Sequence, residues 1–388
     1  MHPPMPHLPF FLASFTWNYA LGMTWLAVPL YAASKGLSGA ELGVLFSLPA
    51  VLQLAINLLG GAYVDRVGGK RIMLASCVLM AVGAAAMNFA WDFATLFGAQ
   101  MVLVLARATF WPANWSIAAE LPGDRGVQAG RLNAVSSAGQ ILGNGCCGFV
   151  LALGGFQLGF GALVALAVAA LLIGLGVPAG PRREATGSGL FHNYGVLVRM
   201  PVLLYGGLCA YLGALPFSLS MSFYPLLLQH LGFGEEASGL LLALRALGGI
   251  VSGLALARFV HTGPVSPWPL IAGACVAAGV GVQPLVSHWA MVGIFMFALG
   301  VGSGLITVFF QVTMAELVEP RMLGSAMALG GVGWGVSHLT TPLIMGFLAD
   351  RYGIAAGFYV LGVISLAVVG VVALLRTWAF SRTRLASI

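Results

Sequence analysis

The sequence predicts an all-α integral membrane protein with twelve transmembrane helices, arranged as two parallel six-helix bundles related by a pseudo-two-fold axis along the membrane normal. Three observations lead to this fold class. Hydrophobic residues make up 60% of the 388 residues and charged residues only 7%, which excludes a water-soluble domain of this length. The apolar runs are long and do not alternate, as membrane-spanning helices require. One long polar connection divides them into two sets of six.

Each apolar run is long enough to cross a bilayer as a helix, which takes about 20 residues. Glycines and charges, such as Gly36, Asp92 and Gly232, separate one run from the next. In chain order the twelve runs cover residues 8–32, 40–64, 72–91, 94–118, 128–153, 158–178, 202–228, 237–259, 268–287, 289–314, 324–348 and 354–376.

The basic residues orient the chain in the membrane. When both termini are placed in the cytoplasm, most of the seventeen Lys and Arg residues fall on that side, and only Lys35 and Arg351 fall on the other. This distribution also explains the net charge of +6, so no nucleic-acid partner is expected. We therefore expect a multi-pass protein of the inner or plasma membrane, with both termini cytoplasmic.

The polar connection and an internal repeat divide the chain into domains. We expect an amino-terminal six-helix bundle in residues 1–180, a cytoplasmic linker in 181–200 and a carboxy-terminal bundle in 201–388. Shifting the sequence by 196 residues places Glu120 on Glu316 and Arg125 on Arg321. Because six is even, each half begins and ends on the same side, so the two repeats are parallel.

A short loop between the second and third runs concentrates charge in a chain that has little of it. The residues that carry its pattern are Gly61, Asp65, Arg66, Gly68, Lys70 and Arg71. Together with the number of runs, the linker and the repeat, this loop resembles the signature loop of the major facilitator superfamily, and the resemblance extends over essentially the whole chain. It implies a secondary transporter that works by alternating access.

The resemblance also implies that this loop forms a conformational latch. In the family, its Asp, here Asp65, faces the start of the eleventh span, which corresponds to residues 323–325. Nearby cations pair with an acid at the end of the fourth span, here Glu120. The expected latch residues are Gly61, Asp65, Arg66, Gly68, Lys70, Arg71, Glu120, Arg125, Glu316 and Arg321.

The loop departs from the family pattern at two places. The position four after Asp65 is Gly69 where the family often has Arg, so Lys70 or Arg71 would supply the pairing. The repeat places His261 opposite Asp65, so the second copy has lost its charges. We therefore expect an asymmetric latch.

The fifth run contains a glycine-rich stretch, residues 139–148. It resembles the motif of the family's antiporters, with Asn144 where that motif has Pro. The resemblance suggests exchange by antiport. The alternative, which we favour, is that glycines four residues apart let helices pack closely in any membrane bundle.

Three ionisable residues fall inside the runs, where a charge costs at least about 2.5 to 3.5 kcal/mol and is rarely idle. Arg107 lies near the middle of the fourth run and resembles the intramembrane Arg of the drug and proton antiporters. Arg245 and His338 lie in the eighth and eleventh runs at similar depth. The alternatives are that Arg107 is a structural clamp on backbone carbonyls or Asn114, and that Arg245 reaches outward to the interface.

The eleven acids, in contrast, all fall in loops or at the ends of runs. Recognition of a lipophilic cation needs a buried carboxylate, so an anionic, zwitterionic or neutral polar solute fits better. The same amides and aromatic residues could instead bond helix to helix. The expected substrate-binding residues are Arg107, Arg245, His338, Asn18, Tyr19, Trp25, Gln53, Asn57, Asn114, Trp115, Tyr211, Gln311 and Trp334.

Coupling to protons would involve His338, because its ordinary pKa of about 6.5 suits the role, or Asp65 and Glu120 in the latch. Enzyme motifs, metal-ligand spacings and soluble signalling modules are absent from the sequence, so neither an enzyme nor a receptor is expected, and no cofactor. We predict a monomeric transporter that exports a small organic solute. The alternative is an uptake permease for a polar metabolite.

Overall fold

The structure is a computed structural model that describes residues 7–178, 195, 197–318 and 323–386. Within its helices the side chains of 57–66, 125–126, 257, 323–325, 328 and 382–386 also lie outside the described residues. The linker expected at 181–200 therefore falls mostly outside them.

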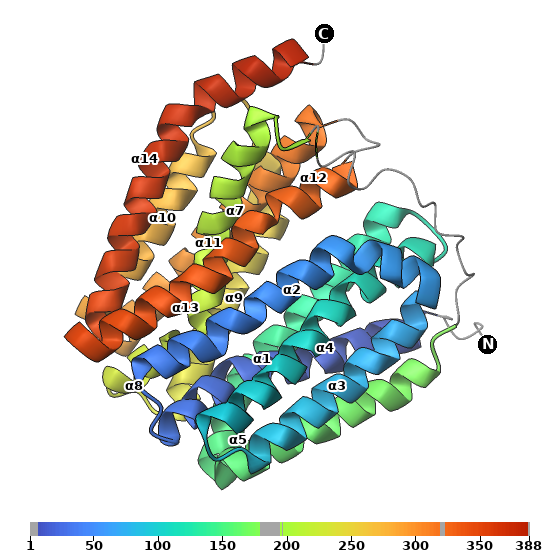
Figure 1. Ribbon diagram of the computed structural model, residues 1–388, viewed down its shortest axis with the longest axis vertical. Helices are drawn as coiled ribbons and strands as arrows, with labels where there is room; N and C mark the ends of the chain where they lie inside the picture. Colours follow the sequence, from blue (N-terminus) through green and yellow to red (C-terminus); the bar gives the residue numbers. More distant parts are fainter. Residues whose placement is uncertain (1–6, 179–194, 196, 319–322, 387–388) are drawn as a thin grey trace. The chain divides into compact units, whose positions relative to one another are not determined.

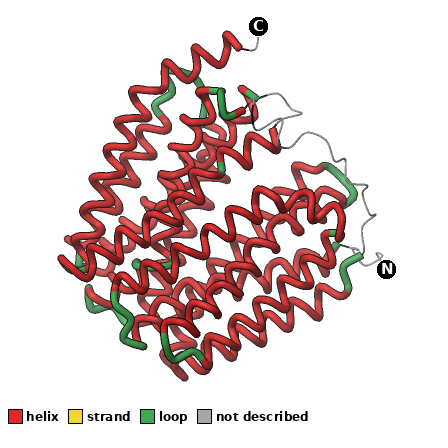
Figure 2. The backbone as a smooth tube through the Cα atoms, in the orientation of Figure 1, coloured by secondary structure: helices red, strands yellow, loops and turns green. Residues whose placement is uncertain are grey.

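The described part of the chain is helical throughout and contains no strand (Figure 2). The helices, labelled in Figure 1, are α1 (Leu8–Ser34), α2 (Gly39–Val67), α3 (Gly69–Phe89), α4 (Phe93–Glu120), α5 (Arg125–Leu175), α7 (Pro201–Ser220), α8 (Tyr224–His230), α9 (Glu235–Val251), η1 (Ser252–Leu256), η2 (Ala257–Phe259), α10 (Trp268–Val282), η3 (Gln283–Leu285), α11 (Trp289–Leu317), α12 (Leu323–Gly330), α13 (Val332–Tyr352) and α14 (Ile354–Ala386).

Twelve crossings follow from these helices. Ten stretches of the described residues are long and apolar enough to span a bilayer. One of them, α5, supplies two crossings, because Gly154 and Gly155 have non-helical backbone angles and Gly155 has a φ of 65°, which an L side chain rarely adopts. Helix α1 is not among the ten, but its 27 residues are long enough to cross a bilayer and give the twelfth crossing.

The chain forms two compact units. The first unit comprises Met1–Thr186 and Phe233–Ala243, and the second comprises Gly187–Gly232 and Leu244–Ile388. The first residues of α9 belong to the first unit, because α5 approaches them closely. A Cβ on Gly239 would lie 2.6 Å from the carbonyl oxygen of Asn144.

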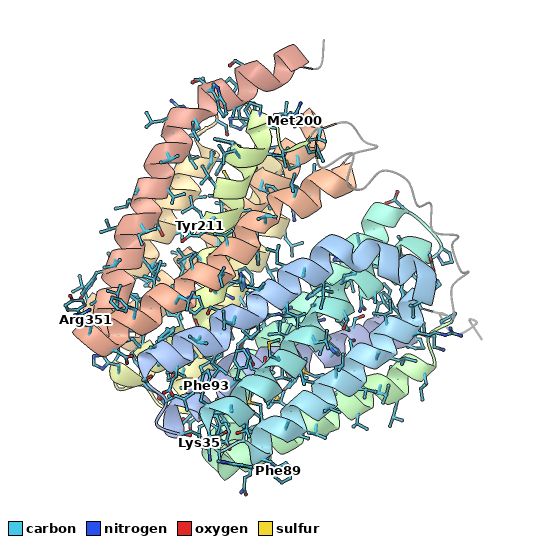
Figure 3. The ribbon with its side chains drawn as sticks, viewed as in Figure 1. Lys35, Phe89, Phe93, Met200, Tyr211 and Arg351 are labelled. Atoms are coloured by element: carbon cyan, nitrogen blue, oxygen red, sulfur yellow. The ribbon has the colours of Figure 1, made fainter. Side chains whose placement is uncertain are left out.

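The turns carry specific end signals. The carboxylate of Asp92 accepts a hydrogen bond of 2.9 Å from the backbone N–H of Thr95 and caps α4. Bonds from the side chain and backbone of Thr95 hold the pKa of Asp92 below its ordinary value, so the cap is charged at neutral pH. Phe89 and Phe93 flank this turn, at the same end of the first unit as Lys35 (Figure 3).

Glycines set the distance between helices in each unit. In the first unit, α1 packs on α5, and a Cβ on Gly139 would lie 2.5 Å from the carbonyl oxygen of Phe15. In the second unit, a Cβ on Gly333 of α13 would meet the backbone of Gly207 on α7. The hydrophobic effect does not drive helices together in lipid, so close packing of their backbones stabilises the association instead.

Candidate functional site

Arg107 is held near the middle of α4 by a neutral amide. Its Nε and Nη2 atoms both donate to Oε1 of Gln53 on α2, at 3.1 and 2.6 Å. Both side chains are half-buried. Because Gln53 is uncharged, it satisfies these donors without neutralising the guanidinium.

A second polar group ties α1 to its neighbours. Ser14 donates to Oδ1 of Asn114 at 2.7 Å, and Asn114 donates to the carbonyl oxygen of Phe110 at 2.9 Å. Gln140 on α5 donates to Oδ1 of Asn18 at 2.8 Å. Asn18 and Asn114 are fully buried, so both join helices, and Gln53 rather than Asn114 holds Arg107.

The other predicted binding residues of the first unit differ in exposure. Tyr19 is half-buried beside Phe15, with 6.3 Å between ring centroids. Trp25 is buried, and Trp115 is 40% exposed. The side chain of Asn57 lies outside the described residues.

In the second unit the structure brings three predicted residues together. The guanidinium carbon of Arg245 lies 4.5 Å from the ring centroid of Phe217. The rings of Phe217 and Trp334 are 5.1 Å apart, and those of Trp334 and His338 are 5.7 Å apart and nearly parallel. We refer to Arg245, Phe217, Trp334 and His338 as the aromatic ladder.

Two further predicted residues lie on the same unit. The hydroxyl of Tyr211 on α7 (Figure 3) is 3.5 Å from that of Thr340 on α13. Gln311 is exposed on α11. Phe217 and Gln140 were not among the predicted residues. The rule that selected Gln53, an amide inside a span, would also have selected Gln140, whereas no sequence signal distinguishes Phe217 from other aromatic residues.

The described acids lie at helix ends and in turns, whereas Arg107 and the aromatic ladder lie inside helices. In the part of the chain that the structure describes, each sits at a helix end or in a turn, namely Glu41, Asp65, Asp92, Glu120, Asp124, Glu235, Glu236, Glu316 and Asp350. Among the described residues, no group of His, Cys, Asp and Glu could hold a metal ion.

Of the latch residues of the first unit, the structure describes the backbone of Gly68 and one contact of Lys70. Gly68 has a φ of 94° between α2 and α3. Lys70 donates to the carbonyl oxygen of Leu175 at 2.8 Å, and among the described contacts neither Lys70 nor Arg71 pairs with Glu120. A Cβ on Gly69 would lie 3.1 Å from the backbone of α4, so α3 and α4 approach closely at this position.

In the second unit, the positions that correspond to two latch residues form a contact in which one partner is uncharged. The hydroxyl of Thr262 donates to the carboxylate of Glu316. In the repeat, Thr262 corresponds to Arg66 and Glu316 to Glu120. The latch as a whole stays a prediction, because much of it lies outside the described residues. This holds for Arg321, for position 61 and for the side chains of Asp65, Arg66, Arg125 and residues 323–325.

Comparison with known families decides the identity of the fold. The model of the Major Facilitator Superfamily matches residues 10–286 and 270–384. The chain belongs to the major facilitator superfamily. It is therefore a multi-pass membrane transporter of small molecules that works by alternating access, as other members of this superfamily do.

Individual superfamily members are similar over shorter stretches or at lower identity. Quinolone resistance protein NorA of Staphylococcus aureus is 25% identical over 132 residues, which span 34% of this chain and 34% of NorA. Probable vesicular acetylcholine transporter-A of Danio rerio is 40% identical over 68 residues, which cover 18% of this chain and 13% of that protein.

Solved structures of superfamily members have the same twelve-helix fold. The crystal structure of the nucleoside transporter NupG superimposes with a TM-score of 0.75 at 14% identity, over 97% of this chain and 99% of NupG. An inward-facing bacterial homolog of the human lysosomal transporter Spinster gives a TM-score of 0.71 at 15% identity, over 99% of this chain and 98% of that one. These likenesses concern the fold alone.

Proposed function

We propose that this transporter exports a small organic solute that is anionic, zwitterionic or neutral and polar. The observation that supports the charge preference is the pair of Arg107 and Gln53, which keeps a full positive charge near the middle of α4. A positive centre attracts a carboxylate or phosphate by charge-assisted hydrogen bonds. It repels a lipophilic cation, and the described acids lie at the helix ends, too far along their helices to compensate for this repulsion.

The direction of transport is proposed from the local similarity to NorA, whose name states resistance to quinolones. Resistance is achieved by a transporter that moves the compound out of the cell. The fold it shares with NupG, a nucleoside transporter, supports the second candidate, an uptake permease for a polar metabolite. We further propose that the transporter is a monomer of the inner or plasma membrane with cytoplasmic termini, and that His338, Asp65 or Glu120 couples transport to protons.

Counterflow in proteoliposomes tests this function. Vesicles holding the full-length protein are loaded with one member of a panel of carboxylates, amino acids, sugars, peptides and lipophilic cations. Uptake of the same labelled compound is then measured with and without a pH gradient. We expect exchange of at least one anionic, zwitterionic or neutral polar compound. Exchange of lipophilic cations alone would refute the proposed charge preference.

The direction needs a separate measurement in cells. We expect cells that produce the protein to accumulate less of the identified compound than cells that carry an empty vector. Greater accumulation would instead support the uptake permease.

A further inference from the structure

The aromatic ladder of the second unit combines an ordered ring surface with a buried cation. Phe217, Trp334 and His338 are each half-buried. Arg245, in contrast, is only 2% exposed. Its guanidinium lies over the ring of Phe217, so the positive charge lies against one of these half-buried rings.

Backbone contacts hold the rings of the ladder in place. Phe217 lies on α7 and Trp334 on α13, and these two helices touch at Gly207 and Gly333, where a Cβ would collide with backbone. At a second point, Ser218 on α7 donates to the carbonyl oxygen of Ser337 on α13 at 3.4 Å. The two ring-bearing helices therefore cannot slide past each other easily, and the ring surface exists before a ligand binds.

The imidazole of His338 is also held in one orientation. Its Nδ1 lies 2.9 Å from the carbonyl oxygen of Trp334. Since a carbonyl oxygen only accepts, Nδ1 is the donor. The ring stays stacked on the indole at an interplanar angle of 18°.

This arrangement selects a ligand by shape and by charge. A flat ring stacks on aromatic side chains with a gain of about 0.5 to 1.5 kcal/mol beyond burial of area, whereas a saturated ring does not. The guanidinium of Arg245, 4.5 Å from the ring centroid of Phe217, attracts an anion bound on these rings and repels a cation. An aromatic surface without Arg245 would accept cations as well.

We propose that the aromatic ladder binds the planar ring of an aromatic acid, and that the transported solute belongs to this chemical class. This inference rests on the proposed function, which supplies the preference for anions, and it adds the requirement for a flat ring. Trp334 and Phe217 are the residues that determine it.

Two anions of equal charge and nearly equal size test the ring requirement. Benzenesulfonate and cyclohexanesulfonate differ in aromaticity and stay charged at all relevant pH values. Their dissociation constants are measured by calorimetry on the full-length protein in lipid nanodiscs, with empty nanodiscs as the blank. We expect benzenesulfonate to bind about tenfold more tightly, a ratio that corresponds to the stacking energy given above.

Variants identify the origin of this ratio. Trp334→Leu should reduce it to about one, and Phe217→Leu, which serves if the first variant does not fold, should do the same. Trp91→Leu is the matched control, because Trp91 is 70% exposed in the turn before α4, and it should leave the ratio unchanged. Arg245→Gln should weaken the binding of both anions by the same factor, because it removes the positive charge that lies over the ring of Phe217.

The outcomes separate the two proposals. Binding of both anions with a ratio near one in the wild type, or with a ratio unchanged in both ladder variants, would overturn the inference and leave the proposed function in place. Absence of binding by either anion would count against the proposed function and against the inference that rests on it.

Discussion

At the scale of single residues, the contact between Arg107 and Gln53 determines the sign of charge in the interior of the first unit. An amide partner accepts hydrogen bonds from the guanidinium without neutralising its charge. A carboxylate in the same place would accept these bonds and also neutralise the charge. The identity of residue 53 therefore matters as much as that of residue 107.

Replacing this amide by an acid tests the argument. Gln53→Glu should lower counterflow of an anionic solute at least about tenfold, because the new ion pair removes roughly 1.4 kcal/mol or more of attraction for the anion. Gln229→Glu, at the exposed end of α8, introduces the same charge away from Arg107 and should have no effect. Wild-type rates in Gln53→Glu would show that the charge of the pair does not select the substrate.

His338 is the titratable residue of the ladder with an ordinary pKa near neutrality, which makes it the ladder's candidate for proton coupling. His338→Gln should abolish the acceleration of transport by a pH gradient while counterflow without a gradient persists. His230→Gln, exposed at the end of α8, is the control. If the gradient still accelerates the His338 variant, this residue is not the coupling group.

The sequence singled out the charged residues of the site together with Gln53 and Trp334, but not Phe217. Arg107, Arg245 and His338 were found because a charged or titratable group inside an apolar run is rare. Phe217 was missed, because an aromatic residue in a membrane helix has no unusual composition, and only its position between Arg245 and Trp334 gives it a role. Contacts between helices far apart in sequence cannot be deduced from hydropathy.

At the scale of helices, the glycine-rich stretch of α5 is a packing surface. Gly139 and Gly143 face α1, and Gly148 faces the first residues of α9. This geometry agrees with the close-packing interpretation of the stretch, and a role in antiport stays a hypothesis. Asn144, which replaces the Pro of the antiporter motif, is fully buried in this region.

Replacement by alanine should therefore affect stability differently at two glycines of α5. In Gly143→Ala the new Cβ would meet the carbonyl oxygen of Tyr19 and lie 3.1 Å from the backbone nitrogen of Met23. We expect a loss of stability of about 1 to 3 kcal/mol, as overpacking costs, seen as a lower midpoint of thermal unfolding in detergent. Gly161→Ala, with nothing within 4 Å, should not lower it, and equal midpoints in both variants would contradict the packing model.

The predicted runs match the helices in order and approximate extent, but their internal breaks were not predicted. The run at 324–348 is two helices, α12 and α13, separated at Gly331, and the run at 237–259 ends in the π-helix η1 and the short η2. Hydropathy measures the free energy of placing side chains in lipid. It does not report the backbone angles at which a helix breaks.

At the scale of the whole molecule, the fold follows from composition and repetition, which explains why the twelve-helix class could be predicted from the sequence. The two halves nevertheless differ in chemistry. The contact between Thr262 and Glu316 in the second unit is neutral on one side, whereas its counterparts in the first half are Arg66 and Glu120. The two halves therefore match in their helices and differ in the charges at these positions.

The central claim is that this transporter selects its solute through the positive charge of Arg107. Counterflow of the best anionic substrate of the panel, measured side by side in wild type, Arg107→Gln and Arg131→Gln, tests it most directly. Arg131 is exposed near the start of α5, so its variant should behave as wild type, and Arg107→Gln should fall at least about tenfold. Equal rates in all three proteins would contradict the claim.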